Sequence, residues 1–237
     1  MRKNVLIIGS APDAILAKEW DNPPFDHIIV INNAWRVRAD WSNCIFPEDF
    51  PPQKRPIKKE NQNLNSAEDY VPAQNYFGGF VYAGGTMAFT AGYWVLYKFK
   101  PDLIGYIGCD MIYEGSKTHF YGKGKADPLR NDKTLKNLKA KSARLEVMAL
   151  KQGCSIVNFS TLQSSNLVFP RQSISDFYDN KNPPGRQINY QRLQMAIKKE
   201  HELGYFVEDG RYWKKMAEFD ADEIEHLDNI WLSTLGY

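Results

Sequence analysis

Short apolar runs rich in β-branched residues constrain the fold of this chain more than any other feature of its sequence. Each run is too short for a typical helix and ends at small or polar residues. Such runs are typical of strands that are buried on both faces of a parallel sheet. We therefore predict strands at residues 5–9, 27–31, 43–47, 80–85, 103–110 and 155–160.

Helical patterns alternate with these runs. Residues 10–20 predict a turn and a short helix, since Pro12 suits a first helical turn. Residues 86–100 predict a helix that is apolar nearly all round and hence deeply buried, with Thr86 as its N-cap. An amphipathic helix is predicted over 132–152. The alternation predicts an α/β, Rossmann-like fold, with a mostly parallel sheet and helices on both faces.

The organisation of the chain follows from where these patterns stop. Residues 1–171 are predicted to form a Rossmann-like nucleotide-binding domain. Within it, residues 51–76 lose the apolar periodicity and predict a long solvated loop or a lid over a site. Residues 172–186 are rich in Pro and polar residues and predict a linker. Residues 187–237 predict a helical C-terminal extension, which either caps apolar surface or binds a partner.

Composition limits the classes of partner. The 30 Lys and Arg residues nearly balance 28 Asp and Glu residues, which argues against a protein that mainly binds nucleic acid. We find no run of about 18 apolar residues that would predict a transmembrane segment. Three widely spaced cysteines predict free thiols and a cytoplasmic location. The sequence is compatible with peripheral contact at the inner membrane and with a homo-oligomer.

Polar and small residues follow the predicted strands. Ligands of parallel α/β sheets bind beyond the carboxyl ends of the strands, so these residues should face one crevice. Small residues after the first strand would let backbone N–H groups approach a phosphate, although the GxGxxG fingerprint is absent. The alternative is that the glycines only form tight turns and that an asparagine caps one. The predicted nucleotide-binding residues are Gly9, Ser10, Ala11, Pro12, Asn32, Asn33, Gly84, Gly85 and Thr86.

A polar loop follows the predicted strand at 103–110. His119 could take a proton from an attacking hydroxyl, because an imidazole titrates near neutral pH. Tyr113 and Tyr121 could donate hydrogen bonds to a leaving phosphate. Asp110 would orient the donor or acceptor, or alternatively cap a turn. The surrounding basic residues suit an anionic ligand or belong to a solvated loop; they are Lys117, Lys123, Lys125 and Arg130.

Five stretches resemble two related groups of proteins. They occur in the order seen in small bacterial sialyltransferases that decorate lipooligosaccharides, and they cover residues 4–171. They are also similar to a broader Rossmann-like family related to archaeal hydroxymethylpterin pyrophosphokinase. The stretches are VLIIGSAPD, IVINNAW, AGGTMAFTAGYWVLYKF, IGYIGCDMIYEG and GCSIVNFSTLQSSNLVFP.

The resemblance implies a glycosyltransferase that moves a sugar from a nucleotide-sugar donor to a glycan acceptor. The resemblance implies a CMP-sugar as the first candidate for the donor. It implies that the turn 9–12 contacts the nucleotide, with Ser10 where the family has Asn. The segment 84–86 matches a second family motif, and Asp110 closes a Gly-x-Asp motif. His119 is the only histidine between Asp110 and the long helix, so it takes the place of the catalytic histidine, at a different spacing.

Two other functions remain as alternatives. Glu48 and Asp49 stand where the sialyltransferases place Asn, and acidic residues that face a diphosphate would need Mg²⁺ between them. This predicts a Mg²⁺-dependent pyrophosphokinase that uses ATP, with Glu48, Asp49 and Asp110 as metal ligands. The third alternative is a non-catalytic nucleotide-binding or assembly protein.

Overall fold

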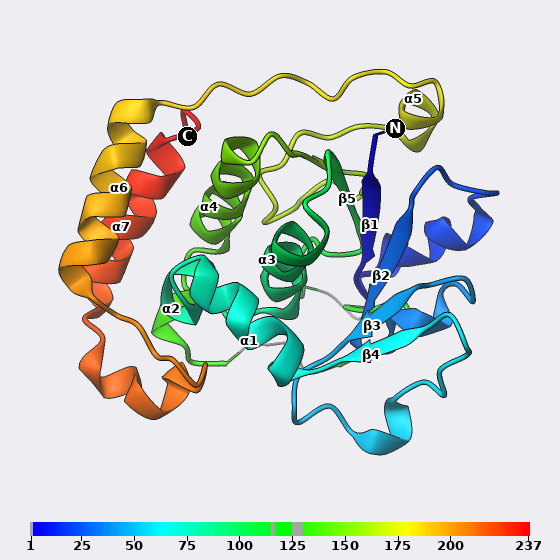
Figure 1. The fold of residues 1–237 in the computed structure, drawn as a ribbon, viewed down its shortest axis with the longest axis horizontal. Helices are drawn as coiled ribbons and strands as arrows, with labels where there is room; N and C mark the ends of the chain where they lie inside the picture. Colours follow the sequence, from blue (N-terminus) through cyan, green and yellow to red (C-terminus); the bar gives the residue numbers. More distant parts are fainter. Residues whose placement is uncertain (1, 115–116, 125–129) are drawn as a thin grey trace.

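A six-stranded parallel sheet forms the centre of the molecule in our computed structural model (Figure 1). The structure describes residues 2–114, 117–124 and 130–237. The strand order is β4-β3-β2-β1-β5-β6, and all neighbouring pairs are parallel. The strands are β1 (Asn4–Ile8), β2 (His27–Ile31), β3 (Asn43–Ile45), β4 (Asn63–Asn65), β5 (Leu103–Ile107) and β6 (Ser155–Asn158).

Strand β1 shows why the apolar runs lack alternation. Val5 and Ile7 pack into the hydrophobic cluster on one face of the sheet, whereas Leu6 and Ile8 pack into the cluster on the other face. All four are fully buried. A central strand covered on both faces needs apolar residues at every position, so the predicted α/β Rossmann-like fold is confirmed.

Helices cover both faces of the sheet. On one face lie α1 (Ala67–Tyr76), α2 (Phe80–Ala83), α3 (Met87–Phe99) and α4 (Leu138–Lys151), with the C-terminal helices α6 (Tyr190–Leu203) and α7 (Ala221–Ser233) packed outside them. The 3-10 helices η1 (Pro12–Glu19) and η2 (Asn32–Arg36) and the helix α5 (Ile174–Tyr178) pack on the other face. Further 3-10 helices are η3 (Pro52–Lys54), η5 (Lys133–Leu135) and η6 (Tyr212–Glu218).

The predicted strand at 80–85 is wrong, because residues 80–83 form the single-turn helix α2. Gly79 before it and Gly84 after it both have positive φ angles, which bound the turn. All four residues of α2 are buried. A short segment that is apolar at every position has the same composition as a buried strand.

The predicted solvated loop at 51–76 is also wrong over most of its length. It contains η3, the edge strand β4 and the helix α1. Ser66 begins α1 with a capping box, in which its backbone N–H donates to the Asp69 carboxylate at 2.9 Å. Pro72 inside the helix obscured the pattern.

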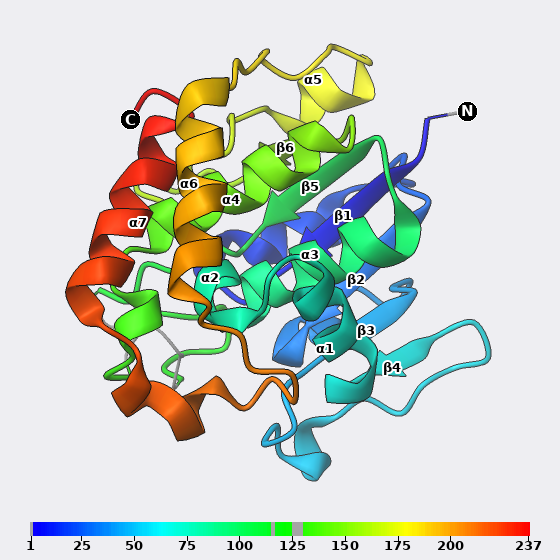
Figure 2. The same ribbon diagram turned by 60° about the vertical axis from the view of Figure 1, so that its left-hand side comes forward.

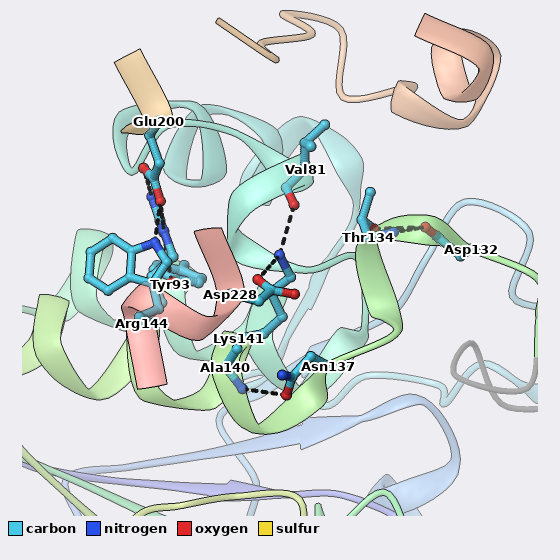
Figure 3. Close-up of polar contacts among 11 residues, drawn as sticks. Val81, Tyr93, Asp132, Thr134, Asn137, Ala140, Lys141, Arg144, Glu200 and Asp228 are labelled. Carbon is cyan, nitrogen blue, oxygen red and sulfur yellow. Dashed lines mark hydrogen bonds and ion pairs between the residues drawn. The ribbon is translucent and has the colours of Figure 1, made fainter. Parts of the chain in front are cut away.

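The C-terminal extension is helical, as predicted, and it packs against α4. Figure 2 shows α6 and α7 side by side on the outer side of α4. Arg144 of α4 donates to the Glu200 carboxylate at 2.6 Å, and Trp231 of α7 donates to the same carboxylate at 2.8 Å. Figure 3 shows the contact between Arg144 and Glu200. Apolar residues of α6 and α7 also belong to the main hydrophobic cluster, so the extension is part of the main core. The predicted linker at 172–186 contains α5.

The described part of the chain contains no helix that is both long and apolar enough to cross a membrane.

Candidate functional site

A cleft of about 500 Å³ lies at the carboxyl ends of the strands. The chain runs outward from β1 through β2, β3 and β4, and then returns to place β5 on the other side of β1. The point between β1 and β5 is therefore the topological switch point, where α/β sheets bind ligands. Gly9, Ser10 and Ala11 after β1 line the cleft, as do Gly108 and Cys109 after β5.

The turn after β1 is built on a close approach of two backbones. A Cβ atom at Gly9 would lie 2.2 Å from the carbonyl oxygen of Gly108, so no larger residue fits without movement. The Gly9 and Ala11 N–H groups donate to the carbonyl oxygens of Ile107 and Gly108, both at 2.8 Å. These two N–H groups are therefore engaged with β5 and its end, contrary to the expected role on a phosphate. Pro12 does not line the cleft.

Asn32 and Asn33 both line the cleft, directly after β2. Asn32 has a φ of 52°, in the left-handed region that asparagine tolerates better than most residues. The Oδ1 atoms of both residues are buried and have no hydrogen-bond partner among the described residues. An unsatisfied buried acceptor costs free energy, so a ligand that donates a hydrogen bond here would be stabilised.

His119 lies in the cleft wall and is held from several sides. Its ring is stacked on Tyr121, with centroids 5.0 Å apart, and its centroid lies 6.0 Å from that of Tyr113. Its Nδ1 is 2.9 Å from Thr118 Oγ1. The N–H of Phe120 donates to the carbonyl oxygen of Ser10 at 3.0 Å, which attaches this loop to the turn after β1. Burial lowers the pKa of His119, so the imidazole is neutral at neutral pH.

The charged residues that line the cleft are mostly basic. Lys54, Lys123 and Arg130 contribute positive charge, and Asp49 is the single carboxylate among the lining residues described. Arg130 and Asp49 form an exposed ion pair at 3.5 Å. The cleft therefore favours an anionic ligand. Lys125, predicted to belong to this basic loop, lies outside the described residues.

The segment 84–86 is only partly a cleft segment. Thr86 lines the cleft and caps α3, because its Oγ1 accepts from the Phe89 N–H at 3.5 Å. Gly84 and Gly85 do not line it. A Cβ at Gly85 would lie 2.2 Å from the Tyr212 hydroxyl, so this glycine makes room for the C-terminal extension.

Asp110 does not line the cleft, although its chain neighbours Cys109 and Met111 do. The residue is fully buried, and Asn158 donates to its Oδ1 at 3.3 Å. Asp13 is a second buried carboxylate nearby that sequence reasoning missed. Its Oδ2 accepts from Ser160 Oγ at 2.7 Å and from the Thr161 N–H at 3.1 Å. The predicted role of Asp110 toward a donor or acceptor stays a prediction.

Replacing Asp13 by asparagine should change how stability depends on pH. Burial raises the pKa of Asp13, and the neighbouring Asp110 raises it further. An acid with a raised folded-state pKa stabilises the fold at low pH, and this contribution is lost as pH rises through that pKa. In urea denaturation, we expect the free energy of unfolding of the wild type to fall as pH rises through the raised pKa of Asp13. The fall should be smaller for Asp13→Asn. The exposed Asp21→Asn is the control, and parallel pH profiles for the wild type and Asp13→Asn would refute the prediction.

The carboxylates proposed as Mg²⁺ ligands are not brought together. Glu48 lies 3.8 Å from Arg211 and does not line the cleft, Asp49 pairs with Arg130, and Asp110 is buried elsewhere. No group of three His, Cys, Asp or Glu residues that could hold a metal ion occurs among the described residues. The geometry does not fit a three-carboxylate magnesium site.

Residues 211–219 of the C-terminal extension hydrogen-bond to residues 132–133, which follow the cleft residue Arg130 in the chain. The sequence did not indicate these contacts. The Tyr212 hydroxyl donates to Asp132 Oδ2 at 2.7 Å. Lys133 Nζ donates to the carbonyl oxygens of Met216 at 3.2 Å and Phe219 at 3.0 Å. Because these partners lie some 80 residues apart in the chain, no local pattern could predict the contacts.

Comparison of the chain with protein-family models, curated proteins and solved structures finds no match. The class of the protein is therefore defined by its own structure. It is an α/β protein with a Rossmann-like fold and a cleft at the switch point of its sheet.

Proposed function

We propose that the protein is a nucleotide-dependent glycosyltransferase. It would transfer a sugar from a nucleotide-sugar donor, with a CMP-sugar as the first candidate, to a hydroxyl group of a glycan. The observation that carries the proposal is the position of His119, a neutral, oriented imidazole in the wall of a basic cleft at the switch point.

The proposed base is the Nε2 atom of His119. The 2.9 Å contact between Nδ1 and Thr118 Oγ1 is compatible with a proton on Nδ1, and in that tautomer the ring carries a lone pair on Nε2. Nε2 would remove the proton from the acceptor hydroxyl as that oxygen bonds to the anomeric carbon of the donor. The bond between this carbon and the phosphate oxygen breaks, and the phosphate takes the electron pair.

The remaining cleft residues would hold the donor. Tyr113 and Tyr121 can donate hydrogen bonds to the phosphate as its charge grows. Lys54, Lys123 and Arg130 would balance that charge. The unpartnered Oδ1 atoms of the two asparagines after β2 would accept from a base or a sugar hydroxyl.

A thermal-shift screen tests the nucleotide. The panel is CMP, CDP, UDP, GDP and ATP, each with and without Mg²⁺. A ligand at about 100 times its Kd adds roughly 2.7 kcal/mol of stability, which gives a clear shift in Tm. A shift in Tm with CMP that is the same with and without Mg²⁺ would support the proposal. A shift confined to ATP with Mg²⁺ would favour pyrophosphoryl transfer, and no shift with any nucleotide would overturn the proposal.

Replacing His119 by glutamine tests the base. We expect transfer from a CMP-sugar to fall on the order of 100-fold, because general base catalysis is lost. The CMP-induced change in Tm should stay the same. The wild-type rate should also fall as pH drops through the lowered pKa of His119, because the protonated ring cannot accept a proton. His201→Gln, on an exposed position of α6, is the control, and full activity of His119→Gln would rule out the base.

A further inference from the structure

A second cavity of about 520 Å³ lies between η1, the segment after β6 and the segment around α5. Among the residues that the structure describes, it shares none of its lining with the cleft. One part of its wall is aromatic: Trp20 meets Phe159 edge to face, with ring centroids 5.7 Å apart. Another part is polar, with the side chains of Ser160, Thr161 and Arg171.

Gln172 lines this cavity and carries a side-chain oxygen that has no hydrogen-bond partner among the described residues. The residue lines the cavity and is only 8% exposed. Its Nε2 donates to the carbonyl oxygen of Lys181 at 2.9 Å, which fixes the amide. Its Oε1 is buried and has no hydrogen-bond partner among the described residues. A ligand hydroxyl group that came within hydrogen-bond distance of this oxygen would satisfy it, whereas a purely apolar ligand would leave it unpaired.

The charged residues of the cavity are largely engaged with the protein. Lys181 forms an ion pair with Asp176 and lies 3.8 Å from Asp179. Arg171 donates from one guanidinium nitrogen to the carbonyl oxygen of Ser160 at 2.8 Å. The described residues of the cavity therefore lack the surplus of unengaged cations that the binding of a phosphate would need.

We propose that this cavity binds a saccharide. A sugar ring has an apolar face that fits an aromatic wall, and its hydroxyl groups both donate and accept hydrogen bonds. This matches the combination of an indole, the hydroxyl side chains of Ser160, Thr161 and Ser173, an amide and a guanidinium group around one space. In this proposal, which rests on the glycosyltransferase function, the saccharide is a distal sugar of the acceptor glycan.

Asp13 links elements that line the two cavities. Ser160 and Thr161, which line the second cavity, both bind the Asp13 carboxylate. Asp13 belongs to η1, and the turn just before η1 lines the cleft. In this proposal the acceptor oligosaccharide runs over the surface of this junction, with one end at the cleft and its distal sugar in the second cavity. This arrangement would select acceptors longer than one sugar.

Saturation-transfer-difference NMR with lactose, N-acetyllactosamine and lacto-N-neotetraose tests the proposal on the full chain without any nucleotide. We expect at least one of these saccharides to bind the wild type. Thr161→Trp places a large side chain at an exposed position of the lining, so it should weaken that binding by at least 10-fold. Ser164→Trp, at an exposed position outside the lining, should not weaken it.

The outcomes separate this proposal from the proposed function. Absence of saccharide binding to the wild type, or equal affinity for Thr161→Trp, overturns the saccharide site whatever the nucleotide screen shows. Saccharide binding that is lost in Thr161→Trp supports the site even if no nucleotide changes the Tm, in which case only the transferase function fails. Inorganic phosphate that competes with the bound saccharide would identify an anion site and would also overturn the proposal.

Discussion

Lys141→Met is expected to lower the free energy of unfolding by about 3–5 kcal/mol, because it leaves a buried carboxylate without its partner. The side chains of Lys141 and Asp228 are 1% and 2% exposed, and Nζ lies 2.8 Å from Oδ1. Nζ also donates to the carbonyl oxygen of Val81 at 3.3 Å (Figure 3). Urea denaturation at pH 7 measures the loss.

Two further variants separate the ion pair from general effects of the substitution. Lys139→Met removes an exposed lysine from the same helix and should have little effect. Lys141→Met combined with Asp228→Leu should recover most of the loss, because no unpaired charge remains. Burial raises the pKa of Asp228, so the deficit of Lys141→Met should shrink as pH falls and Asp228 takes up a proton. Equal stability of Lys141→Met and Lys139→Met would contradict the prediction.

Gly9→Ala is expected to destabilise the fold by about 3 kcal/mol and to distort the cleft. The new Cβ would lie 2.2 Å from the carbonyl oxygen of Gly108 and 2.5 Å from Cys109 Sγ. Because the closest atom belongs to the backbone, β1 and β5 would have to separate at their ends. Thermal denaturation measures the loss, and the nucleotide-induced shift in Tm should decrease in the same variant.

Gly185→Ala is the matched control for this substitution. No heavy atom lies within 4 Å of a Cβ built at Gly185, and its φ is outside the left-handed region. We expect an unchanged or slightly higher Tm, since alanine restricts the unfolded chain. If Gly9→Ala proved as stable as Gly185→Ala, the close approach of the two strand ends would not limit the side chain at Gly9.

The buried strands were predictable from sequence because a strand that is covered on both faces is apolar at every position, and this pattern is visible within a few residues. A strand such as β2 is apolar on both faces, and the predicted range 27–31 is the observed one. The helix α2 was mistaken for a strand because four buried residues are too few to show a helical period. The helix α1 was missed although Ser66 and Asp69 form a recognisable start, because Pro72 broke the expected pattern.

The candidate site was predictable where it depends on strand ends and not where it depends on distant contacts. Parallel strands bring their carboxyl ends to one edge, and Gly9, the asparagines after β2 and His119 do line one cleft there, as expected from the strand ends. Asp110 follows a strand in the same way, but β6 and its neighbours cover it. The need for a glycine at Gly85 comes from the contact with Tyr212, which is close in space but distant in the sequence.

The ion pairs between α4 and the C-terminal helices also have a consequence for the nascent chain during synthesis. At about 5–20 residues per second, a ribosome needs several seconds to add the residues between the end of β6 and Asp228. During this interval Lys141 lacks its partner Asp228, and until α6 is made Arg144 lacks its partner Glu200, so the face of α4 that α6 and α7 later cover keeps two charged groups. A nascent chain with an ionised face is less prone to aggregate than one with an apolar face of the same size.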